Sequence, residues 1–498
     1  LWKPAQGSGK RFSHRAIPRV ETRAYAETEL SAPGWIHQML DVALEAVSNG
    51  TSAILCLPDY RDFGVTVAAL EKLGLLGITV DYSAGRSRSE RYQSYLEVIS
   101  GAPLIVVGTR SVMYAPVSNL GAIAIYDEAD SSHFEQASPY ASTRDIALIR
   151  NSIQQTEIHF IATTPSTAIF RLESLKFLEL VGQDFRPRIA FSAETSRLGN
   201  QARQTIMQGL TKGPVLVQVS NLGVAKSAYC SQCQARTRCK HCQVGSLWLN
   251  ASGQLVCRLC GAQNLDFRCS ECGSSQTRMG RAGSSRTAVE IGKVFPNVIV
   301  SEATGESKTV SIDSKPRIVV ATPEAAPLPD GGYSAVVIVD TDVALGRDTL
   351  MARENAIRQW CNCISMLSPE GQACIEGLTP ELGAKIATWQ IEPLIASELA
   401  ERQAMQFPPV TRILSVTGLK DDVSEAIEVF TRIDGVQLIG ATTTGTEKVA
   451  ILRFAYNQAT SVSREARSLA LKKSTKRISD SGRAVRALTI KMDDFQVL

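Results

Sequence analysis

Short apolar runs alternate with amphipathic segments over the first 180 residues of the chain. Between the runs, segments such as 64–74 and 89–101 carry apolar residues three and four positions apart, which is typical of helices packed on a core. The apolar runs are 51–58, 104–109, 121–127 and 158–164. Strands that alternate with helices favour a parallel sheet covered on both faces, so we expect an α/β lobe over residues 31–212.

A second series with the same alternation predicts another α/β lobe over residues 213–395. Its apolar segments are 213–220, 288–296, 297–304, 317–322 and 335–342. The last part of the chain, residues 396–498, has the order β-α-β-β-α-β, which is typical of a ferredoxin-like α+β domain. The first 30 residues show no clear period, and we expect a linker there.

Eight of the twelve cysteines form four C-x-x-C pairs inside residues 228–275, directly after the first predicted strand of the second lobe. A C-x-x-C turn puts two thiolates on one side of a tight knuckle, and two knuckles complete a tetrahedral Zn–S4 shell. The sequence therefore predicts an inserted module with two structural zinc ions. Disulfides are a weaker alternative, because no apolar signal segment is evident.

The knuckles can pair in a nested or a sequential order. We favour nesting because residues 243–256 are patterned as a hairpin, which returns the inner knuckles to the same place. The nested ligand sets are Cys230, Cys233, Cys269 and Cys272 for the first zinc, and Cys239, Cys242, Cys257 and Cys260 for the second.

The formal net charge of the chain is only +4, but Lys and Arg gather in the cysteine-rich stretch and near the C-terminus. Basic patches of this kind suit a polyanion such as DNA. A solvated helix face and neutralisation of the zinc thiolates are the alternatives. Trp248 and Phe267 are candidates for base stacking, or for the core of the module. The candidate DNA contacts are Arg236, Arg238, Lys240, Arg258, Lys472, Lys473, Lys476 and Arg477.

The strand predicted at 121–127 runs into Asp127 and Glu128, where a nucleotide motor holds Mg²⁺ and aligns water. These two acids are candidate catalytic residues, and acids in a solvated loop are the alternative. A motor also needs a phosphate-binding G-x-x-x-x-G-K-[ST] loop, which the sequence lacks. Gly34 and Trp35 stand at the expected place, with no lysine to clamp a phosphate.

Several motifs in order resemble the PriA family of bacterial primosomal replication restart proteins, in a degenerate actinobacterial form. The segments that carry the resemblance are 108–121, 126–136, 162–174, the eight-cysteine insertion, 283–298, 353–360 and 401–413. The resemblance implies helicase-like RecA lobes. It also implies that a DNA 3′-end-binding domain is missing here and that residues 1–30 are the remnant of its linker. The phosphate-binding lysine and the arginine motif of the family are absent, so ATP and Mg²⁺ binding and helicase activity are not carried over.

The resemblance further implies a cytoplasmic, nucleoid-associated and monomeric protein with no membrane contact. Such a protein binds stalled or branched DNA forks and single strands, and helps to reload the replicative helicase. Its implied partners are primosome proteins, the helicase loader and single-strand-binding protein. Two other functions stay open at this point: an active ATP-dependent 3′–5′ DNA helicase, and an interaction hub that does not bind DNA.

Overall fold

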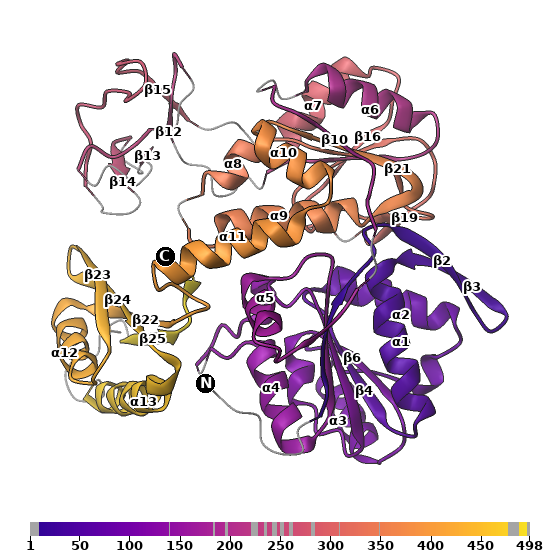
Figure 1. Ribbon diagram of the computed structural model, residues 1–498, viewed down its shortest axis with the longest axis horizontal. Helices are drawn as coiled ribbons and strands as arrows, with labels where there is room; N and C mark the ends of the chain where they lie inside the picture. The colour runs from indigo at the N-terminus through magenta and orange to yellow at the C-terminus, as the bar shows by residue number, and fades with distance from the viewer. Residues whose placement is uncertain are drawn as a thin grey trace.

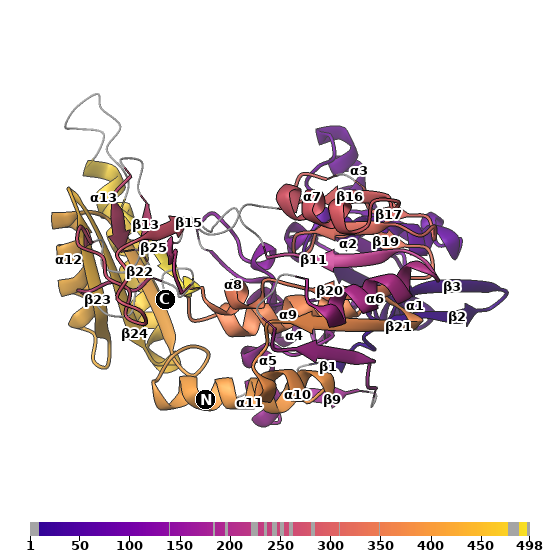
Figure 2. The same cartoon turned by 90° about the horizontal axis from the view of Figure 1, so that it is seen from above.

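The computed structural model of the chain contains two lobes built on parallel sheets, a small cysteine-rich module and a C-terminal α+β unit (Figures 1 and 2). The residues that the structure describes are 9–138, 140–182, 185–194, 198–220, 228–233, 237–241, 247–249, 253–257, 262–279, 284–307, 309–347, 349–476 and 488–495. In these ranges, no helix combines the length and the apolar character needed to cross a bilayer.

The first lobe has a seven-stranded sheet with helices on both faces (Figure 1). Its strands are β1 (Arg11–Arg15), β4 (Ser52–Cys56), β5 (Thr79–Asp81), β6 (Ile105–Gly108), β7 (Leu120–Tyr126), β8 (Glu157–Ala162) and β9 (Glu179–Val181); its helices are α1 (Gly34–Ser48), α2 (Tyr60–Lys72), α3 (Arg88–Ile99), α4 (Thr143–Gln154) and α5 (Thr167–Ser174). All strands are parallel, in the order β5-β6-β4-β7-β8-β1-β9. Neighbouring side chains of a strand point to opposite faces. Leu55 therefore packs under α1 and α2, and Ile54 packs with α3, α4 and α5.

The structure differs from the expected linker at residues 1–30. Strand β1 lies inside the first sheet, between β8 and β9. The chain then forms a hairpin of β2 (Val20–Tyr25) and β3 (Thr28–Pro33) that leads directly into α1. The strand is hidden in the sequence because RFSHR has no apolar run, and only its central residue is fully buried.

The second lobe repeats the architecture with a six-stranded parallel sheet in the order β10-β21-β20-β11-β18-β16. Its strands are β10 (Ile189–Ser192), β11 (Val215–Gln218), β16 (Val300–Ala303), β18 (Ile318–Ala321), β20 (Tyr333–Ile338) and β21 (Leu367–Glu376); its helices are α6 (Asn200–Leu210), α7 (Ser284–Val294), α8 (Thr341–Leu345), α9 (Ala352–Ile364), α10 (Pro380–Ala387) and α11 (Ile391–Ala404). Helices α6 and α7 pack on one face of the sheet, and α9, α10 and α11 on the other. The predicted pair of α/β lobes is confirmed.

The second lobe begins and ends at other residues than the predicted boundaries 213 and 396. Strand β10 pairs with β21, and α6 covers β20 and β21, so this sheet already receives residues from 189 onward. The cysteine module consequently follows the second strand of the lobe in chain order. At the other edge, α11 continues through residue 396 and packs against α5 of the first lobe.

The cysteine-rich module and the C-terminal unit each have a core of their own. The module pairs β12 (Ala228–Cys230) with β15 (Thr277–Met279), and β13 (Leu247–Leu249) with β14 (Leu255–Cys257). The C-terminal unit consists of β22 (Arg412–Leu419), α12 (Lys420–Thr431), β23 (Gln437–Thr444), β24 (Glu447–Phe454), α13 (Ala459–Lys476) and β25 (Thr489–Met492). Its antiparallel sheet has the order β23-β24-β22-β25, which confirms the ferredoxin-like prediction.

Aromatic contacts attach the C-terminal unit to the first lobe. Phe495 packs edge-on against Phe134 with ring centroids 5.9 Å apart. The guanidinium of Arg171 on α5 lies 5.6 Å from the ring centre of Tyr456. The C-terminal unit therefore rests on the part of the first lobe that follows β7.

Asn151 on α4 fixes β1 in the first sheet, which generates a stability prediction. Its buried amide donates to the carbonyl oxygens of Gly9 at 2.9 Å and Thr156 at 2.6 Å, and its Oδ1 accepts from Arg11 at 3.3 Å. Asn151→Ala would leave these carbonyls buried without a donor, so we expect a loss of about 1–3 kcal/mol in the free energy of unfolding. Urea denaturation of the variant and the unchanged chain measures this loss. The matched exposed change Gln93→Ala should have little effect, and an equal effect of both changes would contradict this role.

Candidate functional site

The acidic segment after β7 lies at the edge of the first sheet that faces the second lobe. Asp127 has a left-handed backbone with φ of 50°, and its N–H donates to the carbonyl of Ile161 at 2.8 Å. The tight turn that follows, in which the N–H of Asp130 donates to the carbonyl of Asp127, turns the acids inward. Asp127, Glu128 and Asp130 are all buried. Buried carboxylates require cations or hydrogen-bond donors, so their partners decide what the site can do.

Arg358 of α9 is the cation that forms an ion pair with Asp127. Its Nη1 binds Oδ2 of Asp127 and lies 3.3 Å from Oδ2 of Asp130, and its Nη2 donates to Oε1 of Glu324 at 2.6 Å. The Nδ2 of Asn362, one helical turn further on, donates to the same oxygen of Asp127 at 2.6 Å. Asp127 lies in the first lobe, whereas Arg358, Asn362 and Glu324 lie in the second. One carboxylate oxygen of Asp127, the residue at which a motor would hold Mg²⁺, is thus taken by two donors from the opposite lobe.

Burial and charge act in opposite directions on the pKa values of this cluster. Burial raises the pKa of Asp127, and the positive charge of Arg358 opposes that rise. Burial alone lowers the pKa of Arg358, but the carboxylates of Asp127, Glu324 and Asp130 raise it well above its ordinary value. Arg358 is therefore a permanent cation in a site lined with acids.

Glu128, the second candidate catalytic residue, is also bound by neighbouring side chains. The hydroxyl of Ser166 donates to its Oε1, and Nη1 of Arg144 lies 3.1 Å from its Oε2. Ser166 also caps the N-terminus of α5, where its Oγ accepts from the N–H of Ile169 at 3.0 Å. Burial raises the pKa of Glu128, and Arg144 acts in the opposite sense. Glu128 is thus tied to α4 and α5 of its own lobe.

The space beside Asp127, where the phosphate loop of a motor would stand, is lined by two aromatic rings. The β2–β3 hairpin enters α1 through Pro33, which has no N–H to offer a phosphate. The rings of Trp35 and Tyr126 are stacked with centroids 3.9 Å apart. At Gly34, a Cβ would come within 2.7 Å of the carbonyl oxygen of Ile17, so a residue with a side chain does not fit.

The cavity that the described residues line between the lobes measures about 90 Å³. Its walls include Trp35, Asp62, Asp127, Glu324 and Asn362. Pockets that bury a small ligand usually measure about 300–1,000 Å³. With the lobes in this arrangement, the volume of this cavity lies below that range.

Two further buried arginines join the lobes. Nη2 of Arg61 on α2 donates to the carbonyl oxygens of Thr304 at 2.9 Å and Ser307 at 3.0 Å in the second lobe. Arg402 on α11 lies 2.9 Å from a carboxylate oxygen of Glu354 and donates to the hydroxyl of Thr167 on α5 at 2.8 Å. Together with Arg358, these contacts hold the lobes together at three separate places.

The outer cysteines of the module lie together, as the nested pairing predicts. Cys230 and Cys272 have sulfur atoms 3.5 Å apart, as do Cys233 and Cys269, and the four sulfurs lie within 4.8 Å of one another. A tetrahedron with metal–sulfur bonds of about 2.3 Å has edges of about 3.8 Å. The backbone N–H of Cys233 is the largest cause that lowers the pKa of Cys230, to about 6. These four residues can therefore hold a metal ion.

The inner set is described only in part. Cys239 and Cys257 are buried in the core of the module, whereas Cys242 and Cys260 lie outside the described residues. The sulfur of Cys239 accepts from the N–H of His241 at 3.3 Å and from Nδ2 of Asn264 at 3.5 Å. The antiparallel pairing of β13 with β14 agrees with the predicted hairpin, whose turn also lies outside the described residues. The second metal site stays a prediction.

The candidate DNA contacts divide into three groups. Arg238 and Lys240 are exposed on the module, and Lys240 lies 3.9 Å from Asp266. Lys472 and Lys473 are instead bound to acids of α12, Lys472 to Glu425 at 2.9 Å and Lys473 to Asp422 at 2.6 Å. The remaining positions, or their side chains, lie outside the described part of the chain; they are Arg236, Arg258, Lys476 and Arg477.

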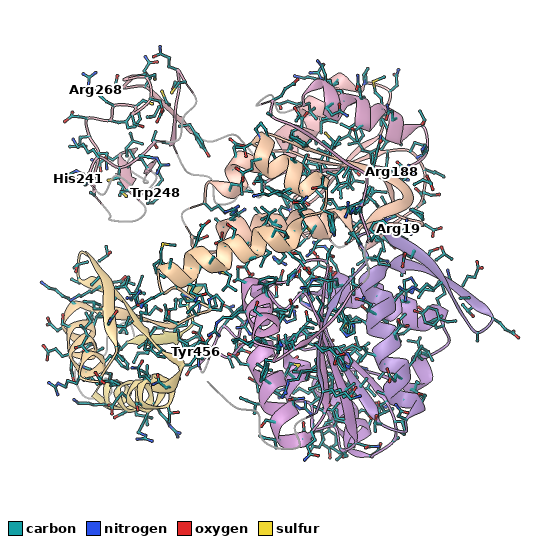
Figure 3. All side chains as sticks on the ribbon, viewed as in Figure 1. Arg19, Arg188, His241, Trp248, Arg268 and Tyr456 are labelled. Atoms are coloured by element: carbon teal, nitrogen blue, oxygen red, sulfur yellow. The ribbon has the colours of Figure 1, made fainter. Side chains whose placement is uncertain are left out.

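Among the residues labelled in Figure 3, His241, Trp248 and Arg268 lie on the module, and Tyr456 lies where the C-terminal unit meets the first lobe. Trp248 is partly exposed and stays available to a ligand. Phe267 is only 7% exposed and belongs to the core of the module, so of its two predicted roles the structure favours the core.

Sequence reasoning missed the partners of the acids, namely Arg358, Asn362, Arg144 and Ser166. Arg358 is 231 residues from Asp127 in the sequence, and no spacing rule connects them. A partial signal was present, because Glu354 and Arg358 interrupt the apolar face of a helix that otherwise packs in the core.

A scan against models of known protein families gives no match. The probable replication restart protein PriA of Mycobacterium leprae is 30% identical over 448 residues, which cover 84% of this chain and 69% of that protein. The replication restart protein PriA of Bacillus subtilis is 23% identical over 377 residues, which cover 69% of this chain and 47% of that protein. The solved structure of RecG bound to a three-way DNA junction covers 80% of this chain and 47% of its own, with 10% identity and a TM-score of 0.40, too low to carry an argument.

Removal of Arg358 tests its role between the lobes. Arg358→Met would leave Asp127, Asp130 and Glu324 without their shared cation, and breaking a buried ion pair in this way costs about 3–5 kcal/mol. We expect a loss of that size in the free energy of unfolding, measured by urea denaturation at pH 7. In the double variant Arg358→Met with Asp127→Asn, the loss should be smaller than the sum of the two single losses.

The matched control is Arg353→Ala on the same helix, because the side chain of Arg353 is 36% exposed and its nearest carboxylates are 3.8 Å away. It should cost less than about 1 kcal/mol. Equal losses for the two arginine variants would show that Arg358 has no special place between the lobes.

Proposed function

We propose that this chain, which belongs to the PriA family of replication restart proteins, works in replication restart as a DNA-binding scaffold and not as an ATP-driven motor. The observation that carries the proposal is the occupation of Asp127 by Arg358 and Asn362. A motor must release and rebind Mg²⁺ and nucleotide at this position in each cycle. Here a permanent guanidinium is bound to Asp127, and the cavity beside it measures only about 90 Å³.

On this proposal, the chain binds stalled or branched forks and single-stranded DNA, and it supports assembly of the primosome. Its partners would be primosome proteins, the loader of the replicative helicase and single-strand-binding protein. Exposed Arg238 and Lys240 on the module support contacts to phosphates, which give affinity without a sequence preference. Trp248, partly exposed on the same module, supports stacking on unpaired bases.

The proposal assigns the metal centre a structural role with zinc. Four thiolates complete a tetrahedral shell and leave no position open for a substrate. The small core of the module, which consists largely of cysteines and a few apolar residues, supports a fold that depends on the metal. We extend the same role to a second zinc held by the inner cysteines.

One observation favours a different function, that of an ATP-dependent helicase. Asp127 and Glu128 retain the acidic pair of such motors at the end of β7. For this function the lobes must separate, Arg358 must leave Asp127, and other groups must replace the missing phosphate loop. DNA-stimulated ATP hydrolysis that Glu128→Gln abolishes would establish it.

Binding to a forked DNA tests the scaffold proposal. Fluorescence anisotropy should show affinity that falls between about 50 and 200 mM salt, because each neutralised phosphate adds about 0.9 to the log–log slope. Arg238→Glu with Lys240→Glu should reduce the slope by about 2. Arg188→Glu, a single charge reversal at an arginine with 72% of its side chain exposed, is the control and should change the slope by less than about 1.

The same preparation should show no ATP hydrolysis above background with or without the fork. Salt-independent binding would contradict the DNA contacts. Fork-stimulated hydrolysis that is lost in Glu128→Gln would contradict the absence of a motor.

Metal analysis tests the module. We expect about two zinc ions per chain by mass spectrometry of the purified protein, and loss of one of them in Cys230→Ser with Cys269→Ser. Cys56→Ser is the matched control because Cys56 is buried in the core of the first lobe, so its zinc content should not change. Two zinc ions retained in the double variant would contradict the ligand set.

A further inference from the structure

Helix α3 of the first lobe presents an apolar face to solvent. Tyr92 is 63% exposed, Tyr95 42%, Leu96 46% and Ile99 39%. Their spacing of three, four and seven residues puts all four on one face of the helix. We call these four residues the α3 stripe. Single exposed apolar residues are ordinary on a protein surface, but a contiguous row on a helix marks an interaction site.

The rest of the helix accounts for its folding without the stripe. Only Ser94 and Val98 of α3 are buried, and α3 packs against β5 at the edge of the sheet. The N-terminus is fixed by a capping box, in which Ser87 accepts from the N–H of Glu90 and Glu90 binds back to Ser87. The stripe is therefore presented on a helix that is already formed, and the lobe does not need the stripe for its own core.

Two arginines give the stripe a charge. Arg88 and Arg91 lie one helical turn before Tyr92 and Tyr95, and both are exposed. Arg86, just before the helix, is paired with Glu90 at 3.6 Å, but within the described part of the chain neither Arg88 nor Arg91 forms an ion pair. Tyrosine and arginine are also the residues that most often dominate the binding energy of interfaces. The face thus combines apolar contacts with two available cations at one end.

We propose that the α3 stripe is a docking site for an amphipathic segment of a partner protein, with apolar residues along one face and acidic residues at one end. The apolar face would cover Tyr92, Tyr95, Leu96 and Ile99, as in helix-against-helix recognition. The acidic end would face Arg88 and Arg91. In Figure 1, α3 lies at the foot of the first lobe, remote from the cysteine module, so this contact would leave the module accessible. The inference does not rest on DNA binding or on the absence of a motor.

Two other occupants fit the surface less well. A second copy of the chain would need a stable interface of more than about 1,000 Å², and a 12-residue helix about 18 Å long offers only part of that area. In an antiparallel pair of α3 helices, the two arginines would also meet no acid within the stripe. Single-stranded DNA could stack on Tyr92 and Tyr95, whose ring centroids lie 6.3 Å apart. It would make little contact with Leu96 and Ile99.

The test uses the whole chain and a labelled 18-residue probe peptide with leucines three and four residues apart and a run of glutamates at one end. Its counterpart carries lysines in place of the glutamates. Fluorescence anisotropy should show that the acidic peptide binds the chain more tightly than the basic one. Tyr95→Ser with Leu96→Ser should weaken binding about tenfold or more. Arg88→Glu with Arg91→Glu should reverse the preference between the two peptides.

The matched control is Ile153→Ser on α4, an apolar residue that is 75% exposed outside the stripe, and it should leave peptide binding unchanged. The stripe variants should keep the melting temperature of the chain, because the substituted side chains are exposed. A lower melting temperature would mean that the stripe serves the fold and would overturn the proposal, as would peptide binding that ignores these substitutions or fails altogether.

Two further measurements decide between occupants. A dimer in analytical ultracentrifugation that Tyr95→Ser with Leu96→Ser converts to a monomer would assign the stripe to a second copy. A thymidine oligonucleotide that displaces the acidic peptide, and loses affinity in the same variant, would assign it to nucleic acid. Either result would overturn the proposal. A monomeric chain whose acidic peptide is not displaced by the oligonucleotide would support it.

Discussion

The arrangement of the two lobes depends on one guanidinium among three acids. Asp127, Asp130 and Glu324 come from both lobes, and Arg358 is the cation that contacts all three. Carboxylates leave water only where charge and hydrogen bonds replace it, and the planar fork of arginine offers several donors at once. The same contact closes the lobes and occupies one carboxylate oxygen of Asp127. On the proposed function, closure of the lobes and loss of a nucleotide site are two consequences of this one interaction.

Two units of the chain fold around cores that are separate from those of the central lobes. The cysteine module has its own core around sulfur atoms, and the C-terminal unit has its own core between α12, α13 and its sheet. Neither core includes residues of the lobes, although aromatic contacts attach the C-terminal unit to the first lobe. On the proposed function, the lobes form the frame that sets the spacing of the two units.

Much of the fold could be predicted because buried parallel strands are continuous apolar runs, as at Ile123–Ile125. Strand β21 was missed because Pro369 and Gly371 interrupt it; a shift in its register with β20 accommodates them. Strand β1 was missed because its neighbours in the sheet come more than a hundred residues later. The outer cysteines could be found from spacing alone, since a knuckle is local. Arg358 could not, because a contact between lobes leaves no local pattern.

The central claim is that Arg358 takes the place of the metal and nucleotide at Asp127. Isothermal titration of the purified chain with a non-hydrolysable ATP analogue and Mg²⁺ tests it most directly, in the presence of forked DNA. The account predicts no saturable binding up to about 1 mM, which corresponds to less than about 4 kcal/mol of binding free energy. Micromolar binding that Asp127→Asn abolishes would show that the lobes open to admit a nucleotide, and it would contradict the account.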